Sequence, residues 1–153
     1  MRTRRLKRAT VARAFWDTSA IVPLCCFQPQ SAQARQMIRS YGQQVVWWAT
    51  AVEAVSSLAR LGRNGQLTPQ EMNQAFARLD YMRARWHEIQ PAEQVRTQAE
   101  RLLKIHRLRA GDALQLAAAL LWCDYQPRNH PFVCGDELLF DAAAAEGFLL
   151  LSI

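Results

Sequence analysis

The sequence lacks the patterns that mark zinc proteins, disulfide-rich domains and membrane proteins. Its four cysteines form no CxxC pair, and its three histidines stand at no metal-ligand spacing beside them. No segment approaches the roughly 20 apolar residues of a membrane span. The basic start runs into Phe15-Trp16-Asp17 without the apolar stretch of a signal peptide. We therefore expect a cytoplasmic protein with free cysteines.

Acidic residues are absent before Asp17, and this absence accounts for the net charge of +6. The first 13 residues hold six basic residues, which leaves 13 basic and 13 acidic residues in positions 14–153. The length suits a single domain, so we expect one domain over 14–153 and a basic N-terminal extension over 1–13. Whether the extension lengthens the first strand, contacts nucleic acid or is disordered is open at this point.

Charges of opposite sign are concentrated in different parts of the chain. Positions 54–109 hold ten basic and five acidic residues, whereas Arg128 is the single basic residue after position 110, against six acidic ones. Arginines near an acidic centre can hold phosphates, but a helical domain of this size often has such an imbalance by chance. For Arg109 we favour a solvated side chain at the start of a helix over a phosphate contact.

Short apolar segments alternate with amphipathic ones along the chain. The apolar segments predict buried strands at 11–16, 45–48, 87–90, 131–134 and 148–152. The amphipathic segments predict a short helical or irregular piece at 20–24 and helices at 31–41, 50–62, 69–86, 95–106, 108–120 and 137–146. This alternation predicts an α/β fold with a mainly parallel sheet and helices on both of its faces.

Four acidic residues stand where predicted elements meet. Asp17 and Asp136 each directly follow a strand, Glu53 lies in the first turn of the helix after the second strand, and Asp112 opens the Ala/Leu-rich helix at 108–120. In parallel sheets the functional crevice lies beyond the carboxyl ends of the strands. Asp17, Glu53 and Asp136 therefore share one rim of the sheet, and Asp112 joins them if its helix also begins there.

Each of these acids also has a purely structural interpretation as a helix cap. Thr50-x-x-Glu53 fits a capping box, and a helix N-terminus favours an acid such as Asp112 by roughly 0.3 to 1 kcal/mol. Capping explains any one acid, but not four of them in segments this apolar. Two carboxylates about 4 Å apart repel by roughly 4 kcal/mol at an effective dielectric near 20, so a cluster of them favours a neutralising cation. Mg²⁺ or Mn²⁺ prefers such oxygen ligands.

Four motifs in a fixed order resemble those of PIN domains, especially the VapC-type toxins of bacterial toxin-antitoxin pairs. The motifs are FWDTSA at 15–20, the segment 50–60, LRAGDALQLA at 108–117, and FVCGDELL at 132–139 with 142–147. The resemblance covers about residues 14–152. It implies a compact α/β/α sandwich and a metal-dependent ribonuclease that forms no covalent enzyme intermediate. It also implies a small antitoxin partner that blocks the site and a homodimer.

The resemblance suggests a role for each residue of the site. We expect Mg²⁺, with Mn²⁺ able to substitute, to be held mainly by Asp17 and Asp112. Glu53 and Asp136 would bind the metal directly or through water, and an activated water would hydrolyse RNA phosphodiester bonds. Thr18 and Ser19 are the expected hydrogen-bond donors behind these ligands.

The chain departs from the family pattern at Cys134. PIN domains usually have Thr or Ser two residues before the last acid, and a thiol is a poorer hydrogen-bond partner, so weaker orientation of Asp136 is expected. This departure supports an alternative function, a catalytically weak or inactive PIN-like module that acts by binding nucleic acid or protein. Two other enzyme classes fit less well: a haloacid-dehalogenase-like phosphatase needs an acid where Ser19 stands, and a receiver domain needs a strand-end lysine, although Lys7 and Lys104 are the only lysines.

Overall fold

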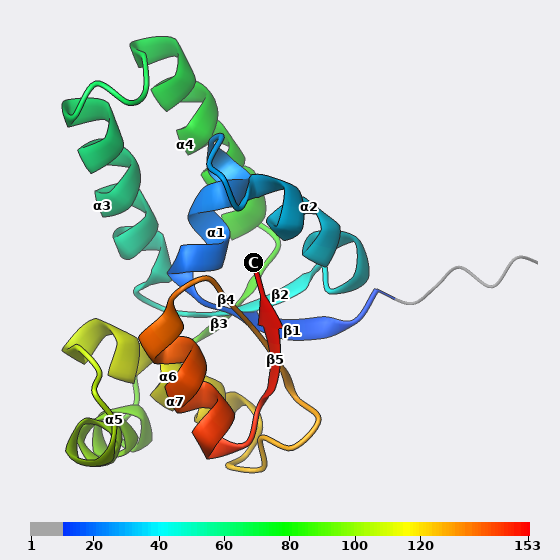
Figure 1. Cartoon of the computed structure of the whole chain (residues 1–153), viewed down its shortest axis with the longest axis vertical. Coiled ribbons are helices and arrows are strands. Elements are labelled where there is room, and N and C mark those ends of the chain that lie inside the picture. The colour runs from blue at the N-terminus through cyan, green and yellow to red at the C-terminus, as the bar shows by residue number, and fades with distance from the viewer. Residues whose placement is uncertain (1–10) are drawn as a thin grey trace, which may run out of the picture.

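A computed structural model describes residues 11–153 and contains one five-stranded sheet between two layers of helices (Figure 1). The strand order is β3-β2-β1-β4-β5, and every neighbouring pair is parallel. The strands are β1 Arg13–Trp16, β2 Gln43–Trp47, β3 His87–Ile89, β4 Pro131–Cys134 and β5 Leu149–Ser152. This architecture confirms the predicted α/β/α sandwich with a parallel sheet. Arg13 of the predicted extension belongs to β1, and residues 1–10 lie outside the described residues, so the extension stays a prediction.

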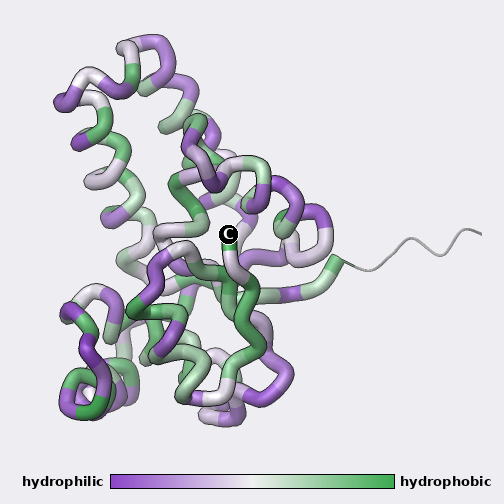
Figure 2. The backbone as a smooth tube through the Cα atoms, viewed as in Figure 1, coloured by the Kyte–Doolittle hydropathy of each residue, from purple (hydrophilic) through white to green (hydrophobic). Residues whose placement is uncertain are grey.

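Two apolar cores, one on each face of the sheet, divide the helices into layers. The first core contains Phe15 and Phe132 and packs against α5 Glu93–Ile105, α6 Ala110–Trp122 and α7 Glu137–Glu146. The second contains Trp16 and Val133 and packs against α1 Thr18–Cys25, α2 Ser31–Ser40, α3 Thr50–Arg63 and α4 Pro69–Arg83. Successive strand residues enter opposite cores because side chains alternate across a strand. Figure 2 shows hydrophobic strands at the centre and more hydrophilic helices and turns at the periphery.

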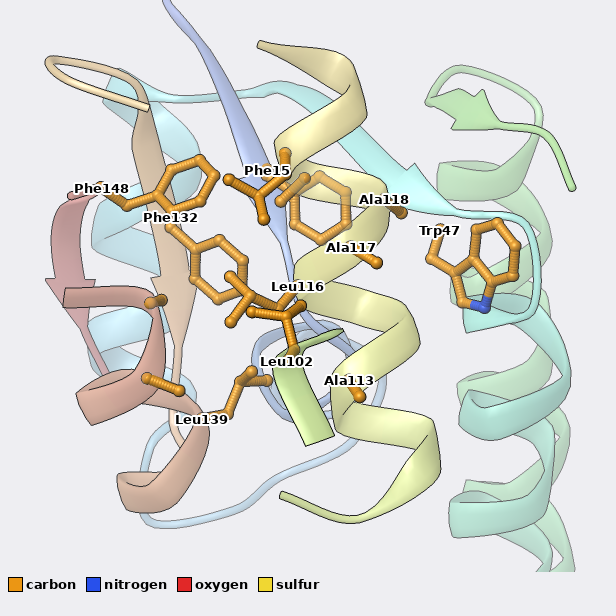
Figure 3. Packing of buried hydrophobic residues seen from close by; sticks show 14 of the residues in the cluster. Phe15, Trp47, Leu102, Ala113, Leu116, Ala117, Ala118, Phe132, Leu139 and Phe148 are labelled. Atoms are coloured by element: carbon orange, nitrogen blue, oxygen red, sulfur yellow. The ribbon is translucent and has the colours of Figure 1, made fainter. Parts of the chain in front are cut away.

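The body of α6 is buried along most of its length, as its Ala/Leu composition predicts. Seven of its residues are buried, and they are Ala113, Gln115, Leu116, Ala117, Ala118, Ala119 and Leu120. Beside it, the rings of Phe15 and Phe132 stack with centroids 5.3 Å apart, and Phe148 lies 5.4 Å beyond Phe132 (Figure 3). Alanine side chains allow the helix to pack closely against this aromatic surface. The helix therefore has a fixed position relative to the carboxyl ends of the strands.

A few segments in the structure differ from the predicted ones. The second strand ends at Trp47 and leaves Trp48 half exposed, and the piece predicted at 20–24 is part of the full helix α1. Ser31 could cap the helix predicted at 31–41, but it is the first residue of α2, and its hydroxyl donates to the carbonyl oxygens of Pro23 and Cys26. Over positions 11–153, no helix is long and apolar enough to cross a membrane.

The tight packing of α6 can be tested by enlarging one buried alanine. Ala117→Leu should lower the free energy of unfolding by about 1–3 kcal/mol, because extra methyl groups in a close-packed core force neighbouring side chains to move. Ala110→Leu is the matched control, since this alanine is exposed in the first turn and the change should stay within about 0.5 kcal/mol. Urea unfolding measures both. Equal losses in the two variants would contradict the packing described for α6.

Candidate active site

The strand order reverses at the paired strands β1 and β4. From β1 the chain passes through α1 and α2 to β2, whereas from β4 it passes through α7 to β5 on the other side of β1. The two connections therefore leave on opposite faces of the sheet, which is the arrangement that creates a crevice in α/β proteins. Asp17 immediately follows β1, Asp136 follows β4 after Gly135, and the backbone N–H of Asp17 donates to Val133 O at 3.1 Å.

The four predicted acids line a single cleft of about 480 Å³ at this crevice. Thr18 and Ser19 line it as well, so the structure brings together every predicted residue of the site except Cys134, which lies beside it. The α1–α2 connection and the outer part of α3 complete the walls, which include Gln28, Pro29, Gln30, Ser57, Arg60 and Leu61. We call this space the four-acid cleft.

Asp17 lies at the floor of the four-acid cleft and is only 3 % exposed. Its Oδ2 accepts hydrogen bonds from the backbone N–H of Ser19 at 3.0 Å and from Ser19 Oγ at 2.5 Å. Burial raises the pKa of Asp17 from 3.8 to about 6; the Ser19 hydrogen bonds oppose this rise, and the negative charges of Asp112 and Glu53 add to it. The carboxylate is therefore held rigidly in a place where its charge is costly.

Glu53 does not form the capping box that its sequence context allows. Ala49 is the N-cap of α3, and no side chain caps this helix. Glu53 Oε2 instead accepts hydrogen bonds from Thr18 Oγ1 at 2.7 Å and from Gln115 Nε2 at 3.0 Å. The acid is thus oriented by α1 and α6, and the capping interpretation of Glu53 is wrong.

Gln115 is a residue of the site that sequence reasoning missed. It is fully buried in α6, and its Nε2 lies 2.9 Å from Thr18 Oγ1, 3.0 Å from Thr50 Oγ1 and 3.0 Å from Glu53 Oε2. Because an ionised Glu53 only accepts hydrogen bonds, the amide must turn its nitrogen toward this group. A lone amide in an Ala/Leu helix, one turn after Asp112, was the available signal.

Asp112 and Asp136 form the outer part of the acidic group. Asp112 lies half-buried in the first turn of α6; burial, followed by the charges of Asp136 and Glu53, raises its pKa, and Arg109 opposes the rise. Asp136 is exposed and caps α7, since its Oδ1 accepts from the backbone N–H of Leu139 at 2.8 Å. Asp112 therefore lies in the first turn of α6 and Asp136 caps α7, and both acids also line the cleft.

Cys134 contacts the main chain of Asp136 and not its carboxylate. The thiol donates to Asp136 O and accepts from Asp136 N, each at 3.3 Å, and burial raises its pKa to about 12. The neutral thiol is unsuited to be a metal ligand, because metals bind the thiolate. Ser19 links the two strand ends instead, since its Oγ donates to Asp17 and accepts from the backbone N–H of Gly135 at 2.9 Å.

The chemistry of the cleft suits a hard divalent cation. Four carboxylates line it, and burial, with a smaller contribution from the neighbouring negative charges, raises the pKa of Asp17 and of Asp112. A cation bound there would offset the cost of these buried charges. Within positions 11–153, no three His, Cys, Asp or Glu side chains already converge as ligands on one point. Carboxylate oxygens are ligands that suit Mg²⁺, an ion that usually keeps several waters in its shell.

The contribution of Gln115 can be measured by removing its amide. Gln115→Leu should lower the free energy of unfolding by about 1–3 kcal/mol, because the buried oxygens of Thr18, Thr50 and Glu53 lose their shared donor. Gln74→Leu makes the same change at an exposed position of α4 and should stay within about 0.5 kcal/mol. Chemical unfolding of both variants gives the comparison. A Gln115→Leu protein as stable as Gln74→Leu would show that the network is not formed.

The burial of Asp17 predicts a pH-dependent effect of its replacement. The Asp17 carboxyl group has a higher pKa in the folded protein than in the unfolded chain, so the folded protein holds its proton more tightly. Ionisation of Asp17 therefore destabilises the fold as the pH rises from about 4 to above 6. In a chelator, the stability of Asp17→Asn relative to the unchanged protein should therefore increase by on the order of 3 kcal/mol between pH 4 and pH 7.5. Denaturant unfolding at several pH values measures this difference. A difference that is constant with pH would be inconsistent with a destabilising buried charge.

Comparison with known proteins supports the fold. No family model matches the sequence, and no curated protein matches it. A structure titled as a toxin-antitoxin complex from Klebsiella pneumoniae is 17 % identical, with a TM-score of 0.58, and the match covers 83 % of this chain and 89 % of that one. PAE2754 from Pyrobaculum aerophilum is 17 % identical, with a TM-score of 0.59 and coverage of 94 % and 92 %. FitAcB from Neisseria gonorrhoeae is 16 % identical, with a TM-score of 0.61 and coverage of 90 % and 96 %. At these identities the likeness establishes the fold alone, and the chain has the PIN-like α/β/α fold that its motifs predict.

Proposed function

We propose that this chain is a PIN-domain ribonuclease that depends on Mg²⁺ or Mn²⁺ and hydrolyses RNA phosphodiester bonds. The observation that carries the proposal is the meeting of four carboxylates from four separate elements in one cleft, at the crevice between β1 and β4. Burial and, to a smaller extent, the neighbouring acids raise the pKa of Asp17 and of Asp112, so the ionised carboxylates destabilise the fold unless a cation neutralises them. Such an arrangement therefore favours a metal-binding function over helix capping.

Asp17 and Asp112 are the proposed main ligands, with Glu53 and Asp136 binding directly or through water. When bound, a divalent cation offsets the charge of the phosphodiester and makes water a better nucleophile. In the hydrolysis, the oxygen of water would bond to phosphorus as the P–O bond to one ribose breaks. The proton of the water would pass to the departing ribose oxygen, so the enzyme would form no covalent bond. The protein keeps the ligands in place through Ser19, Thr18 and Gln115, whose hydrogen bonds restrain Asp17 and Glu53.

We further propose that the chain is a VapC-type toxin of a toxin-antitoxin pair and acts in the cytoplasm. The four sequence motifs support this role, as does the likeness in fold to a structure titled as a toxin-antitoxin complex. The proposed partners are a small antitoxin that covers the four-acid cleft and a second copy of the chain. A short neighbouring gene for a small DNA-binding protein would be the source of the antitoxin.

The nuclease proposal is tested by incubating the purified protein with a mixed RNA pool and Mn²⁺ or Mg²⁺. RNA should be cleaved, and a chelator should stop the reaction. Asp17→Asn and Asp112→Asn should each lower the cleavage rate by more than roughly 100-fold, since even the outer partners of metal ligands contribute 10–100-fold. Asp80→Asn is the control, because this acid is exposed on α4 and lies outside the cleft. Undiminished activity in either cleft variant would disprove the assignment.

Calorimetric titration with Mn²⁺ separates this enzyme from an inactive PIN-like module. The enzyme should take up the ion, and Asp17→Asn should weaken the uptake. RNA binding without cleavage and without carboxylate-dependent uptake would identify a binding module instead.

A further inference from the structure

A second cleft of about 520 Å³ adjoins the four-acid cleft. It lies between the α5–α6 connection and the start of α7, and it is lined by Arg107, Leu108, Arg109, Asp112, Asp136 and Leu138. Asp112 and Asp136 line both clefts, so the two spaces meet at these acids. We call the second space the arginine cleft. Together the clefts form one path whose middle is acidic.

The two ends of this path carry arginines. Arg60 of α3 lines only the four-acid cleft, whereas Arg107 and Arg109 line only the arginine cleft. Arg60 stands seven residues after Glu53 on the same side of α3, about 10 Å farther along the helix axis. In Figure 1, α3 rises away from the sheet while α5 lies at the opposite end of the view. Because Asp112 and Asp136 line both clefts, Arg60 lies on one side of these two acids and Arg107 and Arg109 lie on the other.

These arginines are free to bind an anion. Elsewhere, Arg96 and Arg101 form ion pairs with glutamates. Within the part of the chain that the structure describes, the side chains of Arg60, Arg107 and Arg109 make no ion pair or hydrogen bond, although acids lie in the same clefts. An unpaired guanidinium presents several donors in a planar fork that matches a phosphate.

The shape of the path selects a single strand. Asp17 lies buried at the floor, so a cleaved bond must enter the four-acid cleft to approach it. Its volume of about 480 Å³ is that of a site for a drug-sized ligand, which suits a short stretch of one strand. Leu108 and Leu138 add an apolar wall to the arginine cleft, and Leu138 is 57 % exposed. A base can pack there while its phosphate meets an arginine.

We propose that the two clefts form one binding path for single-stranded RNA. Arg60 binds a phosphate on one side of the cleaved bond, and Arg107 and Arg109 bind phosphates on the other side. The proposal rests on the ribonuclease function proposed above, and it replaces the solvated role that the sequence suggested for Arg109. The flanking contacts hold the strand across the acids, whose charge otherwise repels the RNA backbone.

The first test is salt-dependent binding to the Asp17→Asn protein, measured by fluorescence anisotropy with a labelled single-stranded RNA. Each phosphate contact contributes about 0.7 to the slope of log affinity against log salt concentration for a single strand. Arg60→Gln, Arg107→Gln and Arg109→Gln should each reduce the slope by about that amount and weaken binding several-fold. Arg35→Gln, an exposed arginine of α2 outside both clefts, should leave the slope unchanged. Slopes equal to that of Arg35→Gln in all three variants would overturn the path.

The second test asks whether the arginines act on opposite sides of the cleaved bond. The kcat/KM for cleavage is measured with RNA oligonucleotides shortened from either end. When the oligonucleotide is shortened from one end, Arg60→Gln should no longer lower kcat/KM. When it is shortened from the other end, Arg107→Gln and Arg109→Gln should no longer lower it. Loss of all three effects from the same end would overturn the two-sided arrangement.

Nucleic acids of other kinds complete the design. Single-stranded DNA should show the same slope changes because the arginines contact phosphates, whereas duplex RNA should show none. Equal slope changes with duplex RNA would overturn the single-strand path. If the unchanged protein cleaves RNA but the three variants match the control, the path fails and the ribonuclease stands. If it cleaves no RNA under any metal condition, the proposed function fails, and the binding slopes still decide whether the path exists.

Discussion

The burial of the Asp17 carboxylate at the end of the central strand is the constraint on which the rest of the site depends. Asp17 follows the central strand β1 and is only 3 % exposed, so its carboxylate lies away from bulk solvent. The protein restrains this charge with two hydrogen bonds from Ser19 and surrounds it with three further acids. The cores on both faces of the sheet must offset the resulting destabilisation. The ionised carboxylate therefore lowers stability at the position where we propose a metal ligand.

Helix α6 belongs both to the apolar core and to the four-acid cleft. Its apolar body is packed against the Phe15–Phe132 surface, and this packing fixes the position of the first turn with Asp112. One turn later, Gln115 reaches from the same helix to Glu53 and Thr18. A shift of α6 along its axis would therefore move one acid directly and release another. The polar network makes the position of the helix part of the geometry of the cleft.

The sequence was sufficient to predict the layers of the fold and the meeting of the four acids at one rim, because both follow from local patterns. Apolar segments mark the strands, and an acid directly after a parallel strand must lie at the carboxyl rim. The partners of Glu53 and the relation of Arg60 to Arg109 depend on which elements pack across the crevice. That arrangement follows from the strand order, which no local pattern reveals. For the same reason the sequence could not exclude a capping box around Glu53, which the structure does not contain because Thr50 is turned toward Gln115.

The order of the strands has a consequence for the newly made chain as it leaves the ribosome. A chain that has emerged only as far as β3 contains Asp17 and Glu53, but it has neither the amide that holds Glu53 nor the strand that pairs with the other edge of β1. The four-acid cleft comes into existence only when β4 inserts beside β1 and carries Asp136 to the rim. Synthesis must therefore pass residue 136 before the site can assemble, so incomplete chains lack it. β4 inserts between β1 and β5, which lie near opposite ends of the chain, so the four-acid cleft forms late in folding.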